Sequence, residues 1–446
     1  MFKIIFKNFI RSKGLLLGLL FLLIAGWIGL YTGKQFLNKQ QNIIDKTAHF
    51  QQESIERNVR FVNKEMGLLL YYLRFALVNE TPNLTALSIG QRDINPSVQS
   101  VNIRNLEAQK YDTDLANPMH LLLGNLDFSF VLIYLFPLII IAFMYNLISE
   151  EKEEGTWALI MSQAGTAKNL LWHKFLIRYF AILGVLGFLL WTAFFTLHLS
   201  CDQSFLTIIC ISILYITIWF AISYMIISFQ KDSTFNAQSL LTLWVFLTVI
   251  APALVNNFVA LKYPIPEALA ITVAQRDGYH RKWDADKSET MEKFYAHYPQ
   301  FRAFPLPDKQ FSWLWYYAMQ QMGDDDAHHE ATELRTKLRL RQKASNQIAL
   351  FLPTLHTQLI MNDLCQSSMK NHLHFLDSLT RFHEQKRFYF YPKIFADAPV
   401  NRENWSKHTV EYFREKQDIS VLKIFMPFLL FILFLGVWTW RNLANV

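Results

Sequence analysis

The sequence contains little charge and few cysteines for its length. Charged side chains make up 18% of the 446 residues, whereas a soluble domain carries about a quarter. Hydrophobic residues make up 52% and gather into long runs, which excludes an ordinary soluble protein and predicts membrane spans. The three cysteines, Cys201, Cys210 and Cys365, show neither paired nor metal-type spacing. We expect Cys210, inside an apolar run, to be buried. The sequence allows a single disulfide between Cys201 and Cys365 but does not support it.

Catalytic signatures are also missing. A phosphate-binding loop has the pattern G-x-x-x-x-G-K-[ST], and the nearest match, AGTAKNLL (residues 164–171), lacks the second glycine. The patterns G-x-S-x-G, H-E-x-x-H and C-x-x-C are absent. We therefore expect the chain to be no enzyme and to bind no cofactor, so that a partner or a gradient supplies its energy. The net charge of +7 is uneven, with +4 in the first 14 residues, but no region is basic enough to follow a phosphate backbone, so we expect no nucleic-acid partner.

Six apolar runs are each long enough to cross a hydrocarbon core of about 30 Å. They cover residues 14–31, 128–147, 176–197, 205–229, 240–260 and 421–440. The basic flank before the first run is also typical of a signal peptide, but the run is long and lacks an A-x-A-like cleavage site, so we expect it to stay in place. Pro252 and Asn256 in the fifth run predict a kink or a polar contact inside the protein.

Basic residues in the short loops predict the orientation. Lysine and arginine concentrate in residues 1–13, in the loop 148–175 and at the tail 441–446, whereas the short loop 198–204 has none. By the positive-inside rule, both termini and the loop 148–175 face the cytoplasm. Two long segments, residues 32–127 and 261–420, then lie outside.

The two outer segments differ in pattern. The early part of the first carries apolar residues at steps of three and four, which predicts one face of a helix continuous with the first span. These residues are Ile55, Val59, Val62, Met66, Leu69 and Leu73. The later part of this segment reads as loop and short strand, and the second segment is rich in helix formers. We therefore expect an all-α polytopic membrane protein with six transmembrane helices and two extracytoplasmic, mainly helical insertions.

The loop after the second span is the most informative segment. A glutamate-rich run leaves the membrane and is followed by a Gly-Thr step and an apolar patch. One interpretation is a charged loop that merely ends a span. The other is a short amphipathic helix, punctuated by glycine, that docks onto a cytoplasmic partner. The residues that would carry this docking are Glu150, Glu151, Glu153, Glu154, Gly155, Thr156, Trp157, Leu159 and Ile160.

This loop resembles the signature of the ABC-2 family of ABC permeases, in which a Glu-rich run and Gly-Thr precede a coupling helix. The order of six spans and the stretch from Asn117 to Tyr179 resemble, more narrowly, a bacterial subfamily with large insertions between spans 1 and 2 and between spans 5 and 6. The resemblance implies that residues 150–164 contact a cytoplasmic ABC ATPase dimer, which binds ATP and magnesium. It also implies a second permease copy and a place in the bacterial inner membrane. The usual proline after Ser-Gln is Ala164 in this sequence.

The N-terminal segment, residues 1–13, reads as an amphipathic helix. Lys3, Lys7 and Arg11 form a basic stripe at spacing four, opposite an apolar face. Such a helix lies on the membrane surface, where each basic residue near anionic lipid contributes about 1 kcal/mol. ABC-2 permeases have a comparable elbow helix. A simple basic flank that sets the orientation explains the same residues.

Three other groups of residues have a structural and a functional interpretation. The first, Asp324, Asp325, Asp326, His328 and His329, offers metal ligands, but such a run more often forms a solvated turn that caps a helix, so we expect no metal. The second is an aromatic cluster that fits a domain core better than a ligand platform. It consists of Phe311, Trp313, Trp315, Tyr316 and Tyr317. The third, His198, Asp202 and Asn256, lies at span ends, where polar side chains can line a pathway.

The sequence thus favours a permease subunit of an ABC-2 exporter driven by separate ATPase subunits. The spans contain few charges, so a hydrophobic or lipid-linked cargo, or no cargo, fits better than an ion. The alternative is a mechanotransmitter that uses the same coupling to act on a periplasmic partner without substrate passage. A membrane-embedded enzyme ranks third, because catalytic motifs are missing.

Overall fold

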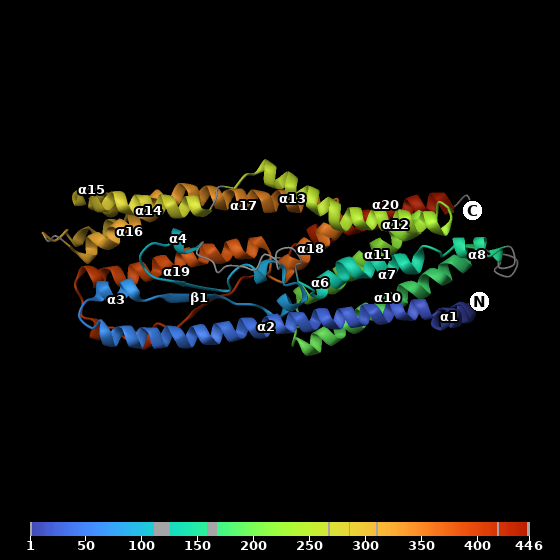
Figure 1. The fold of residues 1–446 in the computed structure, drawn as a ribbon, viewed down its shortest axis with the longest axis horizontal. Coiled ribbons are helices and arrows are strands. Elements are labelled where there is room, and N and C mark those ends of the chain that lie inside the picture. Colours follow the sequence, from blue (N-terminus) through green and yellow to red (C-terminus); the bar gives the residue numbers. More distant parts are fainter. Residues whose placement is uncertain are drawn as a thin grey trace.

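The computed structural model describes residues 2–110, 125–157, 167–265, 268–284, 286–308, 311–416 and 419–443. The molecule is elongated, with a bundle of apolar helices forming one half (Figure 1). The other half is built from the segments between spans 1 and 2 and between spans 5 and 6, and we call it the outer domain after the orientation that the sequence predicts. Both termini lie at the free end of the bundle, beside helix α8 (Ser149–Glu153). Helix α2 (Lys13–Phe61) runs along both halves.

Six helices within the described residues are long and apolar enough to cross a membrane, as the sequence predicts. They are Lys13–Phe61, Phe128–Glu153, Leu171–Thr196, Gln203–Ile227, Ser233–Lys262 and Val421–Asn442. The first is α2, and the third, fourth and sixth are α10 (Ala167–Thr196), α11 (Gln203–Ile227) and α20 (Val421–Leu443). The second and fifth spans are composite. The second is formed by α6 (Phe128–Phe130), η3 (Val131–Leu135), α7 (Phe136–Met144) and α8. The fifth is formed by α12 (Ser233–Val245), η4 (Phe246–Ile250) and α13 (Ala251–Lys262). At the N-terminus, α1 (Phe2–Arg11) precedes them.

The two composite spans share one irregularity. Each contains a π-helical turn, η3 or η4, directly before a segment with a proline in its first turn, Pro137 or Pro252. A proline has no amide hydrogen to donate, and a π turn accommodates the interrupted ladder. The predicted irregularity at Pro252 is therefore present. The Asn256 side chain is exposed on the outside of this single chain.

Helix α2 is 49 residues long, which corresponds to about 73 Å at 1.5 Å per residue. It continues unbroken from the membrane into the outer domain, as the sequence predicts. The expected helical face does not continue to Leu73, because α2 ends at Phe61 and the chain turns before α3 (Met66–Tyr72). This turn lets Leu69, Leu70 and Leu73 enter the core of the outer domain.

The chain is mainly helical, as the sequence predicts, and the outer domain adds one small sheet to its helices. The helices of the first outer segment, besides α2 and α3, are η1 (Asn83–Leu87), η2 (Gly90–Asp93) and α4 (Glu107–Lys110). Those of the second are α14 (Ala268–Asp284), α15 (Lys287–His297), η5 (Pro299–Ala303), α16 (Trp313–Asp326), α17 (His328–Ala349), α18 (Pro353–Leu364), α19 (Met369–Phe395), η6 (Val400–Arg402) and η7 (Trp405–Lys407). The sheet has the order β2-β1-β3, with β1 (Phe75–Asn79), β2 (Val98–Val101) and β3 (Glu411–Phe413). Strand β1 pairs antiparallel with β2 and parallel with β3, where Leu77 faces Glu411.

The two outer segments form one domain rather than the two separate insertions that the sequence suggested. Phe75 and Leu77 from the first segment share a core with Tyr317 and Tyr391 from the second. Phe75 stacks on Phe390 with ring centroids 5.4 Å apart. The central strand β1 belongs to the first segment and β3 to the second, so neither segment completes the sheet alone.

The aspartate run is not a solvated turn. It lies in the last turn of α16, and no side chain caps the next helix, α17. Each acid has its own partner, namely Arg387 for Asp324, His297 for Asp325 and Lys282 for Asp326. Asp324 is only 8% exposed and also accepts backbone hydrogen bonds from Leu106 and Glu107. Burial raises its pKa, while the charge of Arg387 opposes this shift.

The other predictions on single residues have mixed outcomes. The interpretation of the aromatic cluster as domain core is confirmed for Trp315, Tyr316 and Tyr317, which are at most 7% exposed, whereas Phe311 is 44% exposed. All three cysteines are free, and Cys210 is exposed rather than buried. Asp202 caps the N-terminus of α11 by accepting from the Phe205 amide at 2.9 Å, which gives it a structural role. His198 lies in the preceding turn with a φ of 50°.

Candidate functional site

The candidate site is the exit of the second span, where the chain folds into α8 and then reverses. Gly155 adopts a φ of 73°, and its amide bonds to the Lys152 carbonyl at 3.3 Å. A glycine tolerates this left-handed conformation without strain and ends a helix here, as the sequence predicts. The turn directs Trp157 back toward the bundle, where it packs against the main apolar core.

Glu151 fixes the loop to the third span. Its carboxylate lies 2.6 Å from the Lys174 ammonium on α10 and accepts from the Thr156 hydroxyl at 2.6 Å. The side chains of Glu151 and Lys174 are 18% and 13% exposed, so water screens this pair only in part. The neighbouring Glu150 accepts from Asn146 at 3.1 Å, which closes the turn on the N-terminal side of α8.

Glu153 fixes the same loop to the fifth span. Its carboxylate accepts from the Ser233 amide at 2.8 Å and from the Ser233 hydroxyl at 3.0 Å, at the start of α12. A carboxylate at a helix N-terminus satisfies an unpaired amide and interacts favourably with the helix dipole. Lys152 donates to Gln230 at 3.0 Å and lies 5.5 Å from the centre of the Trp157 ring. The sequence suggested that Glu153 faces a partner; within the chain, its exposed carboxylate also binds the first residue of α12.

Among the described residues of the loop, Glu153 and Glu154 are exposed, and Trp157 is only partly buried. These side chains remain accessible to an outside partner. Leu159 and Ile160, which the sequence also placed in the docking patch, lie outside the described residues.

Ser233 and Gln230 were not predicted as members of the site. The only signal for them was the short polar step Lys-Asp-Ser before the fifth run, which is typical of a helix start.

Helix α1 lies at the same end of the bundle as α8 (Figure 1). It stops at Arg11, and Ser12 adopts an extended conformation before α2 begins. Phe9 is buried with its ring edge-on to Phe143 at 6.3 Å, whereas Lys7 and Arg11 are exposed. Lys3 lies within the same helix. The predicted helix is therefore present, and one aromatic residue anchors it to the second span.

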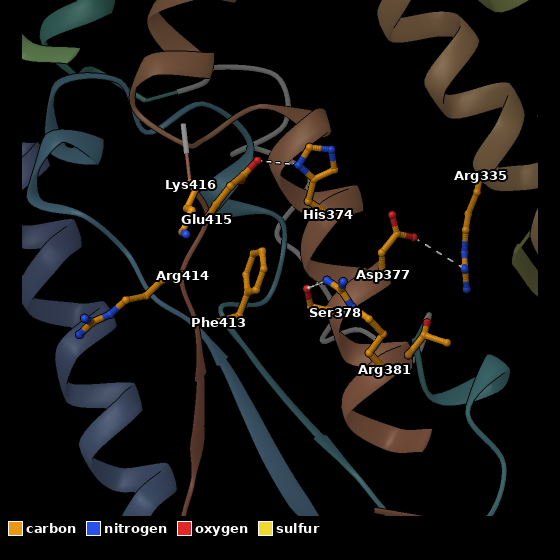
Figure 2. A pocket seen from close by; sticks show the side chains of 10 residues that line it. Arg335, His374, Asp377, Ser378, Arg381, Phe413, Arg414, Glu415 and Lys416 are labelled. Carbon is orange, nitrogen blue, oxygen red and sulfur yellow. Dashed lines mark hydrogen bonds and ion pairs between the residues drawn. The ribbon is translucent and has the colours of Figure 1, made fainter. Parts of the chain in front are cut away.

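A pocket of about 500 Å³ lies in the outer domain between α17, α19 and the end of β3 (Figure 2). Most of its charged groups pair with each other or with close neighbours. Glu415 accepts from His374 at 2.6 Å, and Asp377 lies 3.9 Å from Arg335. Arg381 donates to Ser378 at 2.9 Å. The lining holds four basic side chains, Arg335, Arg381, Arg414 and Lys416, and two acidic ones, Asp377 and Glu415.

Comparison with known families gives one match. The model of the family described as Domain of unknown function (DUF3526) matches residues 268–412, from the start of α14 to β3. No curated protein matches the chain, and no solved structure matches it. The match covers the second outer segment and ends within the strand that pairs with β1, so the matched segment contributes only one strand to the sheet.

Proposed function

We propose that this chain is the membrane-spanning permease subunit of an ABC-2 type exporter, driven by separate cytoplasmic ATPase subunits. The observation that supports the proposal most directly is the anchoring of α8. Glu151 ties this helix to α10 and Glu153 ties it to α12, so a force on α8 reaches three spans at once. A loop that merely ended a span would need no such contacts.

Exposed residues on the fifth span support a second permease copy as partner. Leu254, Phe258 and Leu261 are between 53% and 76% exposed and follow one another at helical spacing along α13. Asn256 and Asn257 are exposed beside them. Amide side chains are unfavourable in lipid and hydrogen-bond readily across helix interfaces. A second copy, or a related permease, would cover these asparagines.

The charge pattern supports an orientation with α8 and both termini in the cytoplasm and the outer domain on the other side of the membrane. The resemblance to a bacterial subfamily would make that side the periplasm. Cysteine substitutions near Asn83 and Asp325 should therefore react with a membrane-impermeant thiol reagent in intact cells, whereas one near Lys168 should not. Background labelling is controlled by replacing the exposed Cys201 and Cys210 with serine. Labelling near Lys168 from outside would reverse the orientation and remove the coupling site from the ATPase.

Mechanotransmission is the alternative, and the continuity of α2 favours it. A single 49-residue helix connects the membrane bundle to the outer domain. A long helix without a break can move the outer domain as the bundle moves. The same coupling would then act on a periplasmic partner rather than export a substrate.

The missing phosphate-binding loop gives the direct test of the energy source. The purified chain should hydrolyse no ATP above background, and activity should appear when a cytoplasmic ABC ATPase is co-expressed and co-purified. The control is the same preparation with the ATPase's own phosphate-binding lysine replaced. Hydrolysis by the isolated chain would refute the proposal, and so would the failure of every ABC ATPase from the same genome to assemble with it.

A further inference from the structure

The outer end of the second span carries a buried polar cluster. Asp127 is 3% exposed and accepts from the Phe130 amide at 2.9 Å, which caps the start of the span. Its other oxygen accepts from the Ile89 amide at 2.8 Å, and Ile89 belongs to the outer domain. The carboxylate of one residue therefore joins the second span to the first outer segment.

Ser129 extends this cluster toward α18. Its hydroxyl donates to Asp127 at 2.9 Å and lies 3.1 Å from the Ser88 hydroxyl. Ser88 donates to Asn362 on α18 at 2.7 Å, and Gln358 donates to the same Asn362 oxygen at 3.0 Å. Both outer segments thus meet the second span at one point. We refer to Asp127, Ser129, Ser88 and Asn362 as the outer latch.

Close backbone packing holds the first span against the outer latch. A Cβ on Gly29 would lie 2.9 Å from the Asp127 carbonyl, and a Cβ on Gly33 would lie 2.1 Å from the Ala86 oxygen. These distances are too short for a side chain at either glycine. Helix α2 therefore packs directly against the backbone at Asp127 and at Ala86. The Gln91 amide donates to the Ser367 carbonyl at 2.9 Å, which ties η2 to the end of α18.

The second span therefore ends in a defined contact on each side. At one end, α8 carries the coupling site, and at the other, Asp127 binds the outer domain. We propose that the second span transmits movement of α8 to the outer domain through the outer latch, so that the nucleotide state in the cytoplasm sets the position of the outer domain. This inference rests on the proposed function and adds to it the place where the outer domain responds.

The test uses the full chain in complex with its ATPase in lipid nanodiscs. Spin labels at Lys407→Cys in the outer domain and Gln203→Cys at the outer end of α11, both exposed, report their separation after Cys201 and Cys210 are replaced by serine. We expect a shift in this distance on adding ATP. Asp127→Asn should reduce the shift by at least half, because an amide nitrogen cannot accept from the Ile89 amide, while ATP hydrolysis is retained.

Asp202→Asn is the matched control. Asp202 also caps the start of a span with a carboxylate, which accepts from the Phe205 amide and from the Ser200 hydroxyl. This variant should keep the full shift. If Asp127→Asn does not insert, Ser88→Ala removes only the bridging hydroxyl and should also reduce the shift. A full shift in the outer-latch variants would overturn the inference while leaving the proposed function intact. Absence of any ATPase complex would overturn both.

Discussion

Replacing Arg387 with methionine is expected to destabilise the outer domain by about 3–5 kcal/mol, as measured for other buried ion pairs that lose one partner. Arg387 is 3% exposed and pairs with Asp324 at 2.8 Å. It also donates to Gln321 and to the Arg104 carbonyl. These contacts join α19, α16 and the first outer segment. The methionine fills the space of the arginine stem but leaves the Asp324 carboxylate buried without its cation.

The loss of stability in the Arg387→Met variant should depend on pH. Burial already raises the pKa of Asp324, and Arg387 opposes that shift. Without Arg387, the Asp324 carboxyl binds a proton more readily in the folded variant than in the unfolded chain. A raised folded pKa gives stability that is present at low pH and is lost as the pH rises. The difference in stability between the variant and the parent should therefore shrink as the pH falls through the raised pKa of Asp324.

Urea unfolding of the detergent-solubilised chain, followed by tryptophan fluorescence, measures this difference. The control is Lys293→Met, because Lys293 and Glu289 form an exposed pair with side chains 61% and 65% exposed. Loss of such a pair changes stability by about 0.5 kcal/mol or less. An Arg387→Met variant that unfolds at the same urea concentration as the control would show that the buried pair does not support the domain.

The double variant Trp157→Ala/Glu154→Lys is expected to weaken ATPase binding by at least about 30-fold. Truncating a buried aromatic anchor at an interface costs about 2 kcal/mol or more, and 2 kcal/mol corresponds to roughly that factor. The charge reversal at the exposed Glu154 adds repulsion to any basic partner residue. Both changes leave Glu151 and Glu153 in place, so α8 should keep its contacts with α10 and α12.

Co-purification and ATP hydrolysis of the reconstituted complex measure this loss. The matched control is Trp191→Ala/Glu292→Lys, which removes an exposed tryptophan from α10 and reverses an exposed charge in the outer domain. The control should bind the ATPase as the parent does. Equal complex yield for both double variants would place the coupling site elsewhere on the cytoplasmic surface.

The spans could be predicted from the sequence because each is a local run of apolar residues. The union of the two outer segments could not, because it depends on the pairing of β1 with β3, which lie more than 300 residues apart in the chain. A three-residue strand such as Glu411–Phe413 carries too little periodicity to be recognised alone. The local pattern of each segment was compatible with a separate domain.

The loop after the second span shows the same limit of prediction from sequence. The glutamate run, the glycine turn and the aromatic residue were visible in the sequence, and their positions on α8 and the turn follow from local helix rules. The partner of Glu153 was not visible, because Ser233 lies 80 residues away on another span. Local patterns therefore identified the loop, whereas the contacts that give each carboxylate its role arise only from tertiary packing.

The parallel pairing of β1 with β3 also sets the order in which the chain can fold during synthesis. Strand β1 is complete when residue 79 emerges, but its partner β3 begins at Glu411. At about 5–20 residues per second, the ribosome needs roughly 15–70 s to reach that strand. During this interval β1 has an unpaired edge, which is a site for aggregation. Four further spans are synthesised before β3. Strand β2 covers only the opposite edge of β1, so a holding chaperone would have to protect the unpaired edge during this interval.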